Sequence, residues 1–114
     1  MNDCIFCKIA NREIPSKLVY DSDEFMAFHD VHPVAPIHVL IIPKAHYSNL
    51  EDIVSTNPLL SKRLLQAVND VASELDVNED GYRLIMNSGE NGGQSVPHLH
   101  FHLIAGTKLN IHLV

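Results

Sequence analysis

The chain has 114 residues, and 46% of them are hydrophobic, which is enough for one buried core in a single domain over residues 1–114. Its 8 Lys and Arg residues against 14 Asp and Glu residues give a formal charge of −6, which argues against binding to duplex nucleic acid. No apolar run approaches the ~18 residues of a membrane span, and the N-terminus lacks a secretory signal, so we expect no nucleic acid, no membrane and a cytoplasmic location.

In the first half of the chain, the hydrophobic pattern predicts one short helix and three strands. Ile5, Phe6 and Ile9 recur at helical spacing, which predicts a short N-terminal helix over residues 4–11. Strands are expected at residues 18–20, 25–29 and 37–42, and the first two should form a hairpin. The third strand is apolar and β-branched, so we expect it to be buried.

In the second half, one long helix and two strands are predicted. Asn57 can cap the helix and Pro58 can be its first residue. An apolar stripe then follows at steps of three or four residues, comprising Leu60, Leu64, Val68, Val71 and Leu75. Strands are expected at residues 82–86 and 99–105. Because only one long helix separates the strands, the sequence predicts an α+β fold with a mostly antiparallel sheet.

Three alternate histidines, His98, His100 and His102, stand at the last predicted strand. Successive side chains of a strand point to opposite faces, so the histidines should share one face while Leu99 and Phe101 face the core. Chance on a solvated face is one interpretation of this pattern, and a three-histidine metal site is another. Histidine as a nucleophile in phosphoryl or nucleotidyl transfer is the third.

A polar, glycine-rich loop over residues 87–95 leads into these histidines. Alone it would be read as a flexible loop, and it lacks the ending of a P-loop. Glycines let backbone N–H groups approach a phosphate closely, and Gln94 and Ser95 add polar side chains. Its position before the histidines favours a phosphate-binding role.

Cys4-x-x-Cys7 is the remaining candidate site near the N-terminus. Two cysteines make no disulfide framework, and two small residues on a helix remain a simple alternative. A tetrahedral structural zinc would need two further ligands, for which the 8 histidines are candidates.

Taken together, these motifs resemble the histidine-triad nucleotide-binding proteins, in the branch that contains purine nucleoside phosphoramidases. The resemblance runs from Cys4 to about Gly106, and the alternating pattern over residues 98–104 is its most specific part. Supporting matches in the same order are Phe28-His29-Asp30, Ala35-Pro36-x-His38, Ile42-Pro43-Lys44-x-His46 and Gly92-Gly93-Gln94-Ser95-Val96.

The resemblance implies a nucleotide-binding hydrolase that acts on nucleoside 5′-phosphoramidates through a nucleotidyl-histidine intermediate. His100 would be the nucleophile, His102 would contact the phosphate, His98 would support the site, and His38 would join the network behind the catalytic imidazole. Ser95 would lie near the leaving group. The α-phosphate would be held by Asn87 and by the backbone of Gly93 and Gln94, and Asp30 would bind ribose. The base pocket would be lined by Ile5, Phe6, Ile9, Phe28, His29 and Val31.

The resemblance also implies a structural zinc that the chemistry does not require, held by Cys4, Cys7, His46 and His98. It further implies a homodimer whose two sheets join, and a purine nucleoside monophosphate or its phosphoramidates as ligand. Pro97 stands where this branch often has Tyr, and the tail over residues 109–114 lacks the Trp-Pro-rich ending of some members, which leaves the leaving-group preference open. A dinucleoside polyphosphate hydrolase and a non-enzymatic zinc-bearing nucleotide-binding module remain the alternative functions.

Overall fold

A five-stranded sheet forms the centre of the computed structural model, which describes residues 3–110. The strands follow the order β1-β2-β3-β5-β4, and every neighbouring pair is antiparallel. Their bounds are β1 Leu18–Asp21, β2 Phe25–His29, β3 Ile37–Pro43, β4 Arg83–Ile85 and β5 Phe101–Ala105. The α+β prediction with an antiparallel sheet is therefore confirmed. The part of the predicted tail over residues 111–114 lies outside the described residues.

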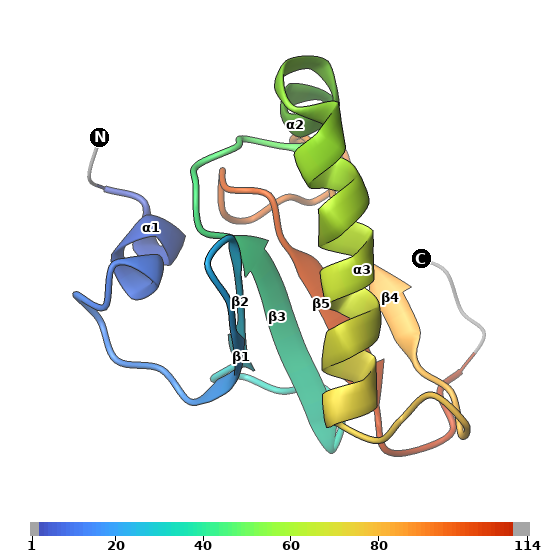
Figure 1. The fold of residues 1–114 in the computed structure, drawn as a ribbon. Coiled ribbons are helices and arrows are strands. Elements are labelled where there is room, and N and C mark those ends of the chain that lie inside the picture. The colour runs from blue at the N-terminus through green and yellow to red at the C-terminus, as the bar shows by residue number, and fades with distance from the viewer. Residues whose placement is uncertain (1–2, 111–114) are drawn as a thin grey trace.

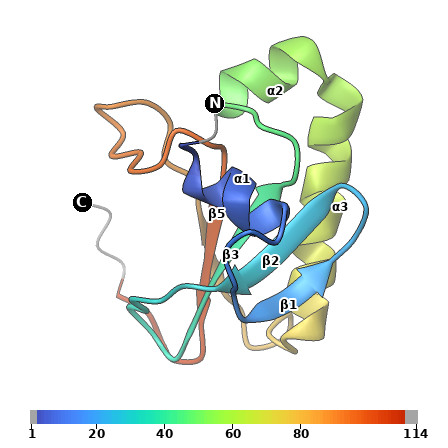
Figure 2. The same ribbon diagram turned by 90° about the vertical axis from the view of Figure 1, so that its left-hand side faces the viewer.

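Helices cover both faces of this sheet (Figure 1). The long helix α3, Pro58–Glu74, packs on one face, and the short helix α1, Ile5–Ala10, lies on the other. The period of two along β2 explains this arrangement, because Phe25 and Ala27 belong to the α3 core while Met26 and Phe28 pack with α1. Figure 2 shows α1 standing in front of β2 and β3, with α3 behind them.

One helix was missed by the sequence analysis, namely α2, Leu50–Thr56. Only Ile53 of its seven residues is buried, so no apolar stripe marks it in the sequence. Its start does carry a signal, because the Asn49 side chain accepts a hydrogen bond from the Asp52 N–H, and the Asp52 carboxylate accepts one from the Ser48 N–H. This Asn-x-x-Asp pattern resembles a capping box.

Four strands differ from the predictions at their ends. Strand β1 reaches Asp21, β3 reaches Pro43, β4 spans only Arg83–Ile85, and β5 begins at Phe101 rather than at residue 99. The late start of β5 has a clear cause, because the Leu99 N–H donates to the Tyr47 carbonyl, in the loop after β3, at 2.7 Å. His98 and His100 therefore precede the strand. Among residues 3–110, no helix is long and apolar enough to cross a membrane.

Candidate functional site

The three histidines alternate with core residues, as the sequence predicts, although only His102 lies within β5. Leu99, Phe101 and Leu103 are all buried in the core beneath α3. On the opposite side, His98 and His100 are almost completely buried, with 0% and 2% of their surface exposed, and His102 is half-buried. Strand β5 and the segment just before it thus hold three imidazoles, each fixed by a hydrogen bond to a backbone carbonyl or to another ring.

A backbone carbonyl determines which nitrogen of His100 is free. The Nδ1 atom of His100 lies 2.8 Å from the carbonyl oxygen of His98, an acceptor, so Nδ1 carries the proton and donates. In the neutral ring, Nε2 then keeps its lone pair. The edge-to-face contact with Phe6, at a centroid distance of 5.0 Å, holds the same ring from the side. This is the tautomer that a nucleophilic imidazole requires.

His102 has the opposite tautomer, because a chain of hydrogen bonds reaches it from the loop before β3. The Val34 N–H donates to Nδ1 of His38 at 3.2 Å, so the proton of a neutral His38 is on Nε2. That Nε2–H donates to Nδ1 of His102 at 3.0 Å. His102 therefore carries its own proton on Nε2. Burial, followed by the proximity of His100 and His38, lowers the pKa of His102 and keeps this ring neutral.

Asp30 stands beside this chain, with its Oδ2 atom 3.5 Å from Nε2 of His38 and its Oδ1 atom accepting the His32 N–H. The donor atoms of Asp30, His38 and His102 lie within 4.8 Å of one another, a spacing that could hold a metal ion. The Val34 N–H argues against that role. It keeps the proton of His38 on Nε2, the atom that would have to bind the metal. We therefore interpret this group as a hydrogen-bond chain.

A different cluster has the geometry of a metal site. The donor atoms of Cys4, Cys7, His46 and His98 also lie within 4.8 Å of one another. The measured separations are 3.3 Å from Cys4 Sγ to His98 Nδ1, 3.5 Å from Cys7 Sγ to the same atom, and 3.3 Å from Cys7 Sγ to His46 Nδ1. A tetrahedral zinc with two thiolates and two imidazoles separates such donors by roughly 3.3–3.8 Å.

The protonation of this cluster also suits a metal. His98 donates from Nε2 to the Pro43 carbonyl at 2.9 Å, which leaves Nδ1 facing the two sulfur atoms. Burial lowers the pKa of His98 to about 4, so the ring is neutral at pH 7. Burial, and then the neighbouring Cys4, raise the pKa of Cys7 to about 11, so a cation must displace a proton when it binds. The four residues therefore fit a Zn²⁺ ion.

A cavity of about 890 Å³ opens beside α1 and contains the predicted base and ribose residues. It is lined by all of Ile5, Phe6, Ile9, Phe28, His29, Asp30 and Val31, together with His38. Sequence reasoning missed the other lining residues, which are Ile14, Pro15, Ser16, Lys17, Pro33, Pro36 and Leu40. Residues 14–17 connect α1 to β1 without any hydrophobic period, so no sequence signal pointed to them.

The predicted phosphate loop is not part of this cavity lining. Within the loop, the N–H groups of Gly93 and Gln94 donate to the carbonyls of Glu90 and Gly89, and Asn87 donates to the Gly92 carbonyl. The Gln94 side chain connects the loop to Ser48 and Val96, while Ser95 is exposed.

Glycine is required in this loop for two separate reasons. A Cβ atom at Gly92 would lie 2.5 Å from the Ser88 carbonyl oxygen, and Gly93 has a φ of +80°. The loop is therefore tightly folded on itself before it meets the histidines.

Comparison with known proteins gives a consistent result. The HIT domain family matches residues 11–109. A histidine triad protein from Clostridium difficile superimposes with a TM-score of 0.92 at 46% identity, covering 99% of this chain and 98% of that one. A structure described as a HIT family hydrolase, from Clostridium thermocellum, also gives a TM-score of 0.92, at 42% identity, covering 100% of this chain and 99% of that one.

Among curated relatives, the purine nucleoside phosphoramidase of Escherichia coli (strain K12) is 42% identical over 107 residues, which are 94% of this chain and 90% of that protein. The region matched by the HIT domain family, residues 11–109, includes the cavity residues from Ile14 onwards and the three histidines. The family match, the alternating histidines and the shared fold agree, and the chain belongs to the HIT domain family.

Proposed function

We propose that this protein hydrolyses nucleoside 5′-phosphoramidates of the AMP type through a covalent nucleotidyl-histidine intermediate on His100. One observation carries the proposal. The His98 carbonyl fixes the proton of His100 on Nδ1, which leaves Nε2 with its lone pair. His100 itself does not line the cavity, but Phe6, which packs on His100, is part of the wall of this cavity of nucleotide size. The phosphoramidase name of the Escherichia coli relative supports the same substrate class.

The cavity beside α1 suits the nucleoside part of such a substrate. In our proposal, its apolar wall receives the base, with Ile5, Phe6 and Phe28 among the contacts, and the Asp30 carboxylate accepts hydrogen bonds from the ribose hydroxyls. Phe6 and His38 join the cavity to the histidines, because Phe6 packs on His100 and His38 donates to His102. The α-phosphate would then lie next to His100. An apolar wall favours a purine by its large surface.

The proposed reaction has two displacements at phosphorus. Nε2 of His100 attacks the α-phosphorus, an N–P bond to the histidine forms, and the P–N bond to the amine breaks. The leaving amine takes a proton from the Nε2–H of His102 or from Ser95. Water then attacks the same phosphorus and returns one proton to the group that protonated the amine, the histidine–phosphorus bond breaks, and the nucleoside monophosphate is released.

Hydrogen-bond donors must meet the charge on the phosphoryl oxygens during both steps. His102, Asn87 and the backbone of Gly93 and Gln94 are the proposed donors, and each such donor contributes roughly 3–4 kcal/mol where measured. The two loop N–H groups donate to loop carbonyls in this structure, so phosphate binding would exchange those partners.

Two further properties belong to the proposal. Cys4, Cys7, His46 and His98 would hold a structural zinc, which would tie α1 to the loop after β3 and take no part in the chemistry. The free outer edge of β4 would pair with the β4 edge of a second copy, which gives a homodimer with one continuous sheet.

Replacement of His100 tests the proposal. His100→Ala should lower turnover of adenosine 5′-phosphoramidate on the order of 10⁴-fold or more, while AMP affinity changes only about threefold. Rapid alkaline quench of the wild type with labelled substrate should trap label on the protein, because a histidine–phosphorus bond survives in alkali, and the variant should trap none. His32→Ala, which changes an exposed histidine, is the matched control and should keep the wild-type rate.

Two outcomes would contradict the proposal. A His100→Ala variant with the wild-type rate would exclude this nucleophile. Faster turnover of diadenosine tetraphosphate than of the phosphoramidate, in parallel assays, would identify a dinucleoside polyphosphate hydrolase instead.

A further inference from the structure

Helix α1 is shared by two separate sites. Cys4 caps the helix and Cys7 lies within it, and both sulfur atoms face His98. The same helix places Ile5, Phe6 and Ile9 in the wall of the 890 Å³ cavity. A change in how α1 is held at its N-terminal end therefore changes one wall of the cavity.

We propose that metal binding at the Cys4–Cys7–His46–His98 cluster and nucleotide binding in the cavity strengthen each other, and that Phe6 is the positioning residue that transmits this coupling. The proposal rests on the proposed function, because it assumes that the cavity takes a nucleotide. It adds that the metal cluster regulates the affinity of that site.

The ring of Phe6 connects the two sites directly. Its centroid lies 5.8 Å from that of His98, a metal-cluster residue, and 5.0 Å from that of His100, the proposed nucleophile. Both contacts are edge-to-face, as is a third with Phe28 at 5.8 Å. His98 also accepts the Nδ1–H of His100 on its carbonyl oxygen. A shift of His98 or of α1 therefore changes the position of the proposed nucleophile through two contacts, the Phe6 ring and the His98 carbonyl.

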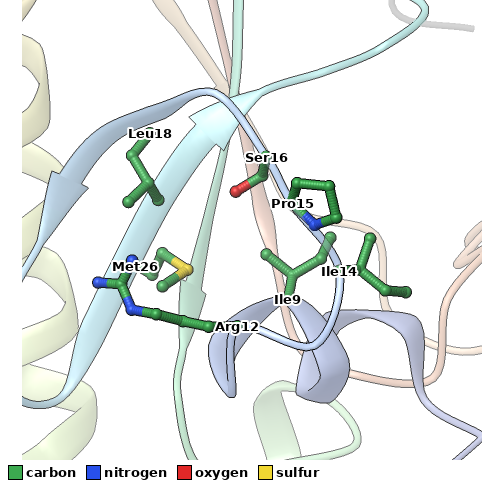
Figure 3. Close-up of a pocket in the computed structure, with 7 residues that line it drawn as sticks. All are labelled: Ile9, Arg12, Ile14, Pro15, Ser16, Leu18 and Met26. Atoms are coloured by element: carbon green, nitrogen blue, oxygen red, sulfur yellow. The ribbon is translucent and has the colours of Figure 1, made fainter.

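Few contacts besides the cysteine cluster determine the position of α1. A helix of six residues is too short to be stable by its own hydrogen bonds, so its position depends on side-chain contacts. Phe6 and Ile9 are its two buried residues, and Ile9 also borders a second cavity of about 140 Å³ (Figure 3).

Figure 3 shows this second cavity between Ile9 of α1 and Met26 of β2, with Arg12 at its rim. Arg12 pairs with Asp21, but this arginine is exposed, and exposed ion pairs contribute little. A metal bound at the Cys4 and Cys7 cluster would therefore add a tether to the packing of Phe6 and Ile9, which are the buried residues of the helix.

The coupling follows from these contacts. A cation bound by four protein ligands fixes α1 against His46 and His98, so a nucleotide that binds afterwards does not have to order the helix. A bound nucleotide likewise orders the helix for a cation that binds afterwards. By linkage, the factor by which the cation tightens nucleotide binding must equal the factor by which the nucleotide tightens cation binding. The core beneath α3 is a separate cluster of side chains, so the effect should remain local to the α1 face.

A thermodynamic cycle tests the coupling without measuring turnover. AMP affinity is measured by calorimetry on the zinc-loaded protein and on protein treated with a chelator, both under reducing conditions. We expect zinc to tighten AMP binding at least about fivefold, and saturating AMP to tighten zinc binding by the same factor. His46→Ala, which removes an exposed ligand outside the cavity lining, should weaken zinc binding and leave AMP affinity at the value of the chelated protein.

Phe6→Leu tests whether Phe6 transmits the coupling between the metal cluster and the cavity. This variant should still bind zinc through its four ligands, but the coupling factor should fall towards one. Val31→Ala is the matched control, because Val31 lines the cavity and is 84% exposed. It should weaken AMP binding equally with and without zinc and so preserve the coupling factor.

Several results would overturn the inference. Equal AMP affinities with and without zinc, or a protein that binds no zinc, would exclude coupling. Loss of the far-ultraviolet circular dichroism signal on chelation would show a global structural role instead. Failure of the proposed function is distinguishable, because AMP would then not bind under either condition.

Discussion

At the scale of single residues, two neighbouring imidazoles receive opposite roles from their hydrogen-bond partners. His100 donates from Nδ1 to a carbonyl, so its Nε2 offers a lone pair. His102 accepts at Nδ1 from His38, so its Nε2 offers a proton. A lone pair and an N–H donor side by side suit the displacement of an amine at phosphorus that we propose.

The first prediction concerns the protonation of His102. Because burial and then the neighbouring His100 lower its pKa, the ring should titrate below the ordinary value of 6.5 and be neutral, with the proton on Nε2, at pH 7. The unfolded chain binds more protons in this window, so the free energy of unfolding should decrease as the pH falls below 6.5. Nitrogen-15 NMR of the imidazole rings measures both midpoint and tautomer. A midpoint above 6.5 would contradict the prediction.

The second prediction concerns His38, which orients His102. His38→Phe keeps a ring of similar size but removes the donor to His102 and the acceptor for the Val34 N–H. Turnover should fall about tenfold, the rate equivalent of one hydrogen bond, while the KM for the phosphoramidate changes less. His38→Gln keeps one N–H donor and should recover part of the loss. An equal loss in both variants would indicate a packing role instead.

At the scale of elements, Asn57 joins two helices. Its N–H ends α2 by donating to the Ile53 carbonyl, and its side chain begins α3 by accepting the Leu60 N–H. Our third prediction is that Asn57→Ala lowers the free energy of unfolding by about 1 kcal/mol, the usual effect of losing such a cap. Urea denaturation measures it. Asn69→Ala, at an exposed position within α3, is the control and should not destabilise the protein.

The elements with strong local signals were predictable from the sequence. Asn57 and Pro58 marked the start of α3, and the first four residues of the predicted stripe, from Leu60 to Val71, are buried in the core. Leu75, its predicted last member, is the partly buried C-cap that follows the helix. Helix α2 was not predictable by periodicity, since it buries Ile53 alone. The start of β5 depended on a hydrogen bond from Leu99 to Tyr47, a contact between distant parts of the chain that no local pattern encodes.

Part of the candidate site could also be predicted from the sequence, and part of it could not. The alternation of His98, His100 and His102 predicted their common side, and the resemblance to the histidine-triad proteins supplied the four metal-cluster residues that the structure brings together. Residues 14–17 line the cavity because the segment between α1 and β1 passes along it, which is a property of the tertiary fold. The hydrogen bonds within the loop around Gly93 could not be predicted from the sequence either.

At the scale of the whole molecule, the sheet separates a scaffold from a functional face. One core cluster joins the sheet to α3, and a second, smaller one joins it to α1. The cavity, the metal cluster and the proposed nucleophile all lie with the smaller cluster. Local opening is easier where fewer apolar side chains are packed, so the α1 face can respond to ligands while the α3 face keeps the sheet rigid.

The last prediction addresses the proposed homodimer. Strand β4 ends the sheet, and Leu84 on this edge is 36% exposed, so a second β4 can pair with it. Leu84→Lys places a charge on that edge, a device that blocks pairing between sheet edges, and should shift the mass measured by light scattering from dimer towards monomer. Leu59→Lys is the control. Leu59 is 68% exposed and lies four residues before Arg63, which pairs with Glu24 beside the opposite edge strand. A protein that is monomeric before any change, or a dimer that survives the Leu84 substitution, would show that β4 is not the interface.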